Sequence, residues 1–175
     1  MVMGMLAAGG MPILADSDRA ADPHNPRGYF EYTPVKRLRE DNAWLPLARG
    51  HAVKVISFLL PSLPEGERYR ILYVKRALSE VLASQAAMLG ETGDTTQAAD
   101  ATLQAAWENT EARVTAWLAA RPDIAVLPVS HAAVLAEPEV AARNMADFLG
   151  HALDSGRMAA WVDRGLHRQR GAAPG

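Results

Sequence analysis

The chain contains no cysteine, few aromatic residues and no excess of either charge. Because cysteine is absent, disulfides, thiolate nucleophiles and cysteine-based zinc sites are excluded. Lysine and arginine number 18 against 20 aspartate and glutamate residues, so the formal net charge is −2. A chain balanced in this way has no long-range field that attracts nucleic acid or an anionic membrane surface. We therefore expect neither nucleic acid nor a membrane as a partner.

A long hydrophobic run is missing as well. The first 14 residues, MVMGMLAAGGMPIL, carry no charge, but Gly9, Gly10 and Pro12 interrupt them. The run is too short to cross a bilayer and lacks the basic start of a signal peptide. It predicts a short buried helix at 1–8 that ends at the glycine pair, and by default a cytoplasmic location.

Patterns typical of metal sites are also missing. The five histidines show no ligand spacing, and the Asp16/Asp18 pair is not followed by the glycine and distal glutamate of a calcium loop. We expect no bound metal.

What the sequence does contain is an alternation of apolar, β-branched runs and helical patterns, within 175 residues of which 49% are hydrophobic. These values predict one globular domain, 1–170, followed by a flexible tail, 171–175. Strand then helix in repetition indicates an α/β fold: a three-layer parallel sheet with helices on both faces. Three good strands are few for such a sheet, so we expect that a first strand is missing and that the fold is N-terminally incomplete. The predicted strands are 11–14, 53–58, 69–74 and 124–129, and the predicted helices are 34–41, 77–89, 96–120, 137–149 and 155–162.

The most informative stretch is RYRILYVKRALSEVLASQ, residues 68–85. An apolar strand ends at Arg76 and a helical pattern follows, and ligands of open α/β sheets bind beyond the carboxyl ends of their strands. Arg76 and Ser84 would there hold a phosphate between a guanidinium and a hydroxyl group. The alternative is that Arg76 is a solvated charge and Ser84 an ordinary small helical residue.

Five segments in order resemble the sulfotransferase family, in particular the bacterial sulfotransferase-like proteins of the P-loop superfamily. They are MLAAGGMPIL, NPRGYFEYTPVKRL, WLPLARGHAVKVIS, YRILYVKRALSEVLASQ, and EPEVAARNMADFLG with LHRQR. The resemblance implies a P-loop NTPase-like fold and 3′-phosphoadenosine 5′-phosphosulfate as the donor of a sulfuryl group. It also implies that Arg76 and Ser84 bind the 3′-phosphate of this donor. The acceptor would be a hydroxyl group on a small molecule or a carbohydrate.

The sequence departs from this family in two places. The family's first strand and its glycine- and serine-rich phosphosulfate loop would precede Met1, and the basic Arg-Lys-Gly motif near the C-terminus is replaced by LHRQR. Arg168 or Arg170 would take over the phosphate contact of that motif. Without the loop, which supplies backbone N–H donors to the transferring group, transfer would be impaired or lost. The missing strand would also leave a sheet edge through which the chain could form a homo-oligomer.

Sulfuryl transfer also needs a base for the acceptor hydroxyl. Glu31 is the preferred candidate, because it follows the loop Asn25-Pro26-Arg27-Gly28 and the aromatic pair Tyr29 and Phe30. His51 is the second, because histidine titrates near neutral pH, although it precedes a strand and should lie at the opposite end of the sheet. Lys54, within that predicted strand, is either an edge residue or a charge directed at the ligand.

Two alternatives to a sulfotransferase stay open. The first is a non-catalytic remnant of the same fold that binds a nucleotide or serves as an interaction module. The second is a nucleotide kinase-like P-loop relative that also lacks its loop.

Overall fold

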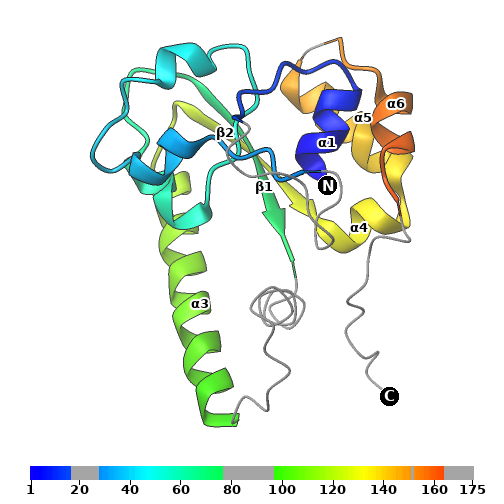
Figure 1. Cartoon of the computed structure of the whole chain (residues 1–175). Helices are drawn as coiled ribbons and strands as arrows, with labels where there is room; N and C mark the ends of the chain where they lie inside the picture. The colour runs from blue at the N-terminus through cyan, green and yellow to red at the C-terminus, as the bar shows by residue number, and fades with distance from the viewer. Residues whose placement is uncertain (17–27, 77–96, 151, 164–175) are drawn as a thin grey trace.

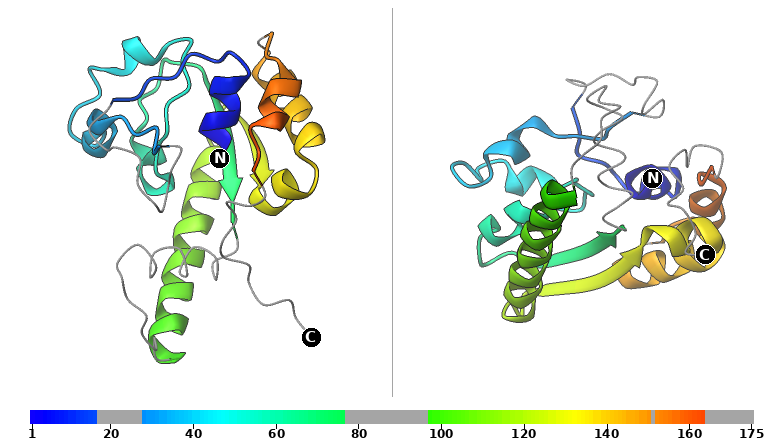
Figure 2. Two further views of the ribbon diagram at one scale, coloured as in Figure 1. Left: turned by 45° about the vertical axis from the view of Figure 1, so that its right-hand side comes forward. Right: turned by 90° about the horizontal axis from the view of Figure 1, so that it is seen from below.

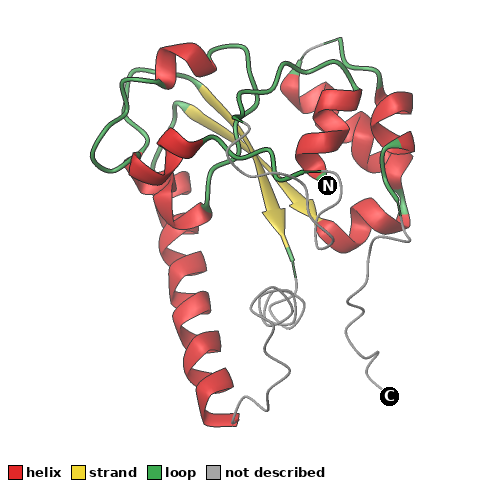
Figure 3. Cartoon of the chain, in the orientation of Figure 1, coloured by secondary structure: helices red, strands yellow, loops and turns green. Residues whose placement is uncertain are grey.

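The computed structural model describes residues 1–16, 28–76, 97–150 and 152–163. The described part is a mixed helix and strand chain with a small sheet of two parallel strands, in agreement with the α/β class (Figures 1 and 3). The predicted helix 77–89 and the predicted tail 171–175 lie outside the described residues. The elements in order are α1 (Val2–Ala8), the 3-10 helices η1 (Thr33–Arg37), η2 (Leu45–Ala48) and η3 (Ser57–Ser62), β1 (Tyr69–Lys75), α3 (Gln97–Ala119), β2 (Ile124–Ser130), α4 (His131–Ala136), α5 (Pro138–Leu149) and α6 (Ser155–Ala160).

β1 and β2 form the sheet that the sequence predicted at 69–74 and 124–129. They pair in parallel, from Tyr69 opposite Ile124 to Lys75 opposite Ser130. Pro128, which lacks an N–H group, lies within β2 opposite Tyr73. A proline is tolerated in an edge strand, where the missing donor can face away from the partner strand. Among the described strands β2 pairs only with β1, so an edge position explains Pro128.

Two other predicted strands are wrong. Neither 11–14 nor 53–58 forms a ladder among the described residues: Ile13 makes an isolated parallel bridge to Ala52, which precedes 53–58. Phe58 instead lies inside η3, which contains Pro61. Val53 and Val55 have strand-like sequence but no hydrogen-bonded neighbour among the described strands, and an extended segment without a neighbour does not form a ladder. The predicted helix 34–41 is also shorter than expected, because η1 ends at Arg37.

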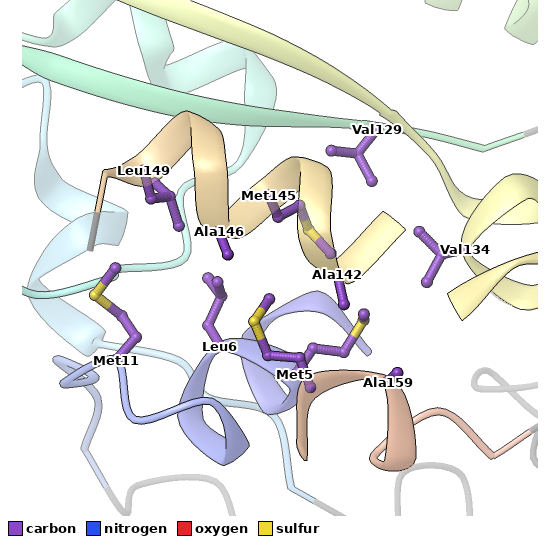
Figure 4. Close-up of a cluster of buried hydrophobic side chains, with 11 residues drawn as sticks. Met5, Leu6, Met11, Val129, Val134, Ala142, Met145, Ala146, Leu149 and Ala159 are labelled. Atoms are coloured by element: carbon purple, nitrogen blue, oxygen red, sulfur yellow. The ribbon is translucent and has the colours of Figure 1, made fainter. Parts of the chain in front are cut away.

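Helices lie on both sides of the strand pair, with α3 on one side and α1, α4, α5 and α6 on the other (Figures 1 and 2). Each side has its own buried cluster. The α5 cluster consists of Met5, Leu6, Met11, Val129, Val134, Ala142, Met145, Ala146, Leu149, Met158 and Ala159 (Figure 4). The α3 cluster consists of Val35, Leu38, Trp44, Leu45, Leu59, Leu60, Leu63, Tyr73 and Val114.

Side chains on the two faces of β1 pack against the two different clusters. Leu72 packs against the α5 cluster, whereas Ile71 and Tyr73 belong to or pack against the α3 cluster. Successive side chains of a strand point to opposite faces, so an apolar run with no polar alternation is what a strand covered on both sides requires.

α5 begins at Pro138 and ends at Leu149 with Gly150 as its C-cap, within one residue of the predicted 137–149. Gly150 has φ of 65° and its N–H donates to Ala146 O, the left-handed ending that glycine favours. The guanidinium of Arg70 in β1 donates to the carbonyl oxygens of Phe148 and Leu149. A cation on the last carbonyls of a helix also opposes the negative end of its dipole. Arg70 therefore ties β1 to the end of α5.

Gly4 allows α1 to pack closely on α6. It is buried, and a Cβ atom at this position would overlap the indole of Trp161, the residue that ends α6.

We predict that Gly4→Ala destabilises the chain by about 1–2 kcal/mol, because the overpacking cost exceeds the gain in helix propensity. Urea unfolding followed by tryptophan fluorescence measures the change. An increase in stability, of the size that alanine brings to an unobstructed helix, would contradict the close packing of Gly4 and Trp161.

Candidate functional site

A groove of about 1210 Å³ runs along β1. One wall is the continuous stretch 67–74, and the other is the continuous stretch 48–55. Its basic side chains come from both walls and from the ends of the strands, whereas its acidic side chains are Glu67 and Asp123. The basic and histidine residues that line the groove are Arg49, His51, Lys54, Arg68, Arg70, Arg76 and His131.

The carboxyl end of the strand pair brings Arg76 and His131 together. Lys75 and Ser130 are the last pair of the register, so Arg76 and His131 occupy the next position on each chain. Neighbouring strands lie roughly 4.8 Å apart, which brings the two backbones close together. Both residues are half-buried and both line the groove. Two basic side chains therefore occupy the position where ligands of parallel sheets bind.

The surroundings of this pair are polar. Ser130 Oγ accepts from Ala133 N at 3.3 Å and caps α4. The ammonium of Lys75 lies 5.9 Å from the centre of the Tyr73 ring, and the Lys75 side chain is exposed. Arg76 and His131 line this end of the groove and the exposed Lys75 lies next to it in sequence, which suits an anionic group such as a phosphate.

The other end of the groove lies at the amino end of β1. His51 lies there, because Arg49, two residues before it, binds Glu67 just ahead of β1, with Nε to Oε2 at 3.3 Å. The imidazole Nδ1 of His51 is 3.0 Å from Arg49 O. Seven strand residues span roughly 23 Å, so one small ligand does not reach both His51 and Arg76. The structure thus places His51 where the sequence expected it, away from the carboxyl end.

Glu31 is engaged by two lysines. Its carboxylate is 3.3 Å from Lys54 Nζ and 3.8 Å from Lys36 Nζ, and its side chain is 23% exposed. Lys54 Nζ also donates to Tyr29 O at 3.3 Å. Lys54, Tyr29 and Phe30 line the groove, whereas Glu31 does not. Lys54 thus both lines the groove and contacts the Glu31 carboxylate.

The remaining expected site residues, Ser84, Arg168 and Arg170, lie outside the described residues. Of the residues predicted to bind the donor, the structure places only Arg76.

His131 is the residue that sequence reasoning missed. It was considered only as a metal ligand, for which its spacing is wrong. The signal was nevertheless present, because each of the two apolar strands is followed directly by a basic residue or histidine near its end: Arg76 after YRILYVK and His131 after IAVLPVS. Parallel pairing of the two runs brings these residues together.

An ion pair between Arg121 and Asp123 lies just before β2, at the amino end of the strand pair. Arg121 Nε donates to Asp123 Oδ1 at 2.7 Å, and the Arg121 side chain is only 9% exposed. This hydrogen bond and the positive charge of Arg121 lower the pKa of Asp123 below its ordinary value of 3.8, although desolvation opposes them.

A lowered pKa in the folded state makes the Asp123 contribution to stability complete at neutral pH. It is lost as the pH falls below about 4 and through the folded pKa. We predict that Asp123→Asn flattens the acid limb of the stability curve. The unfolding midpoint, measured from pH 6 to pH 2, should therefore fall more steeply for the wild type than for the variant. Parallel curves would contradict this role of Asp123.

Among the residues that the structure describes, no group of three histidine, aspartate or glutamate side chains is placed to hold a metal ion. Within the same residues, no helix has the length and apolar character needed to cross a membrane. Comparisons of the chain with protein-family models, with curated proteins and with solved structures find no match.

Proposed function

We propose that the chain is a sulfotransferase-like protein that binds the 3′-phosphate of 3′-phosphoadenosine 5′-phosphosulfate at the carboxyl end of β1. The observation that carries the proposal is the position of Arg76, half-buried beside His131 where two parallel strands end. A planar guanidinium suits a phosphate dianion, and an adjacent imidazole adds a second donor. The order of family-like segments in the sequence supports the same assignment.

The finer architecture is part of the proposal. A three-layer, P-loop-like parallel sheet is supported by the two buried clusters on opposite sides of the strand pair. The extended stretch 52–55, bridged to Ile13, would belong to the same layer.

The chain's own residues fit part of the donor. Arg76 and His131 fit a phosphate, and the groove beyond them has room for a nucleoside and an acceptor. The described residues include no glycine-rich loop that would cradle the sulfuryl group, so no transfer step is assigned to them. The acceptor remains a hydroxyl group of a small molecule or carbohydrate, and Glu31 remains the proposed base, with its carboxylate held by Lys54 and Lys36.

The proposal is tested by calorimetric titration with 3′,5′-adenosine bisphosphate, the desulfated donor. Adenosine 5′-monophosphate is the matched control, because it lacks only the 3′-phosphate. We expect micromolar binding of the bisphosphate and at least about 100-fold weaker binding of the monophosphate, because the two charge-assisted contacts to Arg76 are lost. Equal affinities, or no binding by a folded chain, would refute the proposal.

The same titration distinguishes the kinase-like alternative, and a transfer assay distinguishes the remnant. A kinase-like relative would prefer adenosine triphosphate to the bisphosphate. A non-catalytic remnant would bind the bisphosphate, but would still fail to transfer sulfuryl groups once a strand and glycine-rich loop are fused ahead of α1.

A further inference from the structure

The loop at 28–31 contains a residue whose backbone is strained. Within the ranges that the structure describes, Phe30 is the one non-glycine residue with a positive φ, which is 50°. Left-handed backbone brings the Cβ atom close to the following carbonyl oxygen, so a bulky residue rarely adopts it. Strained residues persist only where neighbouring contacts hold them, and they gather at ligand sites and switches. The contacts on either side of Phe30 therefore show what holds it.

Lys54 contacts the residue before Phe30 and the residue after it. Its ammonium group donates to Tyr29 O and to Glu31 Oε1, each at 3.3 Å. We call these two hydrogen bonds the Lys54 bridge. Asp16 N donates to Glu31 O at 2.9 Å, which anchors the chain after Phe30 independently of Lys54. The Lys54 bridge thus spans the strained residue.

Lys54 is also placed to bind a ligand in the groove. Its side chain is 41% exposed and lines the groove, whose basic side chains outnumber Glu67 and Asp123. An oxyanion in the groove would compete for the ammonium group with one carbonyl oxygen and one carboxylate. That carboxylate, of Glu31, keeps a second cation, because Lys36 Nζ lies 3.8 Å from Glu31 Oε2. Lys54 can therefore turn to an anion without leaving a carboxylate unpaired, which would be costly.

We propose that an oxyanion bound in the groove draws Lys54 out of its bridge and thereby releases Phe30 from the left-handed conformation. Gly28, with φ of 82°, precedes the two aromatic residues and gives the chain a point at which to rotate. Tyr29 and Phe30 both line the groove, so their release changes the wall beside the anion. The anion binds one state of the loop better than the other, which is the condition for a ligand to shift a conformational equilibrium. The proposal does not depend on the proposed function, because Arg76 takes no part in it.

The test is a titration of the full chain with inorganic sulfate, followed by NMR. The intraresidue HN–Hα cross-peak of Phe30 reports the sign of φ, because these two protons are closest when φ is positive. We expect this cross-peak to weaken severalfold as sulfate is added, and to keep its intensity in sodium chloride of equal ionic strength. An unchanged cross-peak would overturn the proposal, whether or not sulfate shifts the resonances at 75–76.

Two lysine variants test the bridge itself. Lys54→Met removes the bridge and keeps a long side chain, so its Phe30 cross-peak should already be weak without sulfate. Lys36→Gln is the matched control, because Lys36 carries the same charge and contacts the same carboxylate but does not line the groove. We expect this control to keep the positive φ and the response to sulfate. A strong cross-peak in the folded Lys54→Met variant, or an equally weak one in Lys36→Gln, would contradict the role of the bridge.

Phe30→Gly gives a further measurement that does not require the Lys54 variant to fold. Glycine adopts a positive φ without steric cost, so release of the loop no longer contributes to the binding of sulfate. The dissociation constant of sulfate, taken from the amide shifts of 53–55, should therefore rise by about threefold to tenfold. Equal dissociation constants would show that sulfate relieves no strain at Phe30, and would overturn the proposal. Because no nucleotide is present, none of these outcomes bears on the proposed 3′-phosphate site.

Discussion

Replacing Arg76 by alanine is expected to weaken the binding of 3′,5′-adenosine bisphosphate by about 100-fold, which calorimetric titration measures. A guanidinium that meets a phosphate makes two parallel charge-assisted hydrogen bonds, each worth roughly 1.5–3 kcal/mol. A loss of about 1.4 kcal/mol corresponds to a factor of ten in affinity. Alanine removes both bonds and leaves the His131 imidazole beside the phosphate position.

Arg68→Ala is the matched control for this variant. Arg68 also lines the groove, but it is exposed and precedes β1, at the opposite end from Arg76. Its replacement removes the same charge and should change the affinity by less than about threefold, since exposed charges at this distance are largely screened. Equal losses from the two variants would mean that the groove attracts the nucleotide by its overall charge and that Arg76 has no specific contact.

Replacing Arg121 by alanine is expected to have the largest effect on stability, about 2–4 kcal/mol, because several carbonyl and carboxylate oxygens lose a charged donor at once. Arg121 donates to Leu63 O and to Pro64 O, each at 3.0 Å, and to Asp123. It also lies over the ring of Trp117, at 5.0 Å from the centre. Arg121 thus links the end of α3 to the loop that leads into β1. Thermal unfolding followed by circular dichroism should show a midpoint lowered by roughly 10 °C.

Arg113→Ala provides the comparison for Arg121. Arg113 is in α3 and is exposed, so its replacement should change stability by no more than about 0.5 kcal/mol. A variant of Arg121 that unfolds at the same temperature as this control would show that the two carbonyl contacts do not hold the loop.

The sequence predicts the elements whose local pattern and packing agree. β1, β2 and α5 were predicted to within about a residue, because β-branched apolar runs and the Pro138-to-Gly150 frame are local signals that the neighbouring clusters reinforce. Residues 53–58 carry the same kind of local signal, but the strand predicted there does not form. A strand requires a hydrogen-bonded partner, and the sequence of a segment does not report whether its neighbour is present.

The candidate site was predicted in part for a similar reason. Arg76 was recognised because a strand end followed by a helical pattern is visible within one stretch of sequence. His131 was not recognised, because its position beside Arg76 depends on the pairing of β1 with β2. These two segments are separated by more than 45 residues. Glu31 was predicted as the general base, and only the structure brings Lys36 and Lys54 to it. Pairing between distant segments is the information that a local pattern does not contain.

The most direct test of the central claim, that the carboxyl end of the β1–β2 pair binds the 3′-phosphate, is chemical-shift mapping of the chain with 3′,5′-adenosine bisphosphate. We predict that the largest amide shifts fall on 74–76 and 130–131, and that adenosine 5′-monophosphate produces much smaller shifts there. Shifts centred instead on Arg49, His51 and Glu67, or spread evenly along the groove, would contradict the claim.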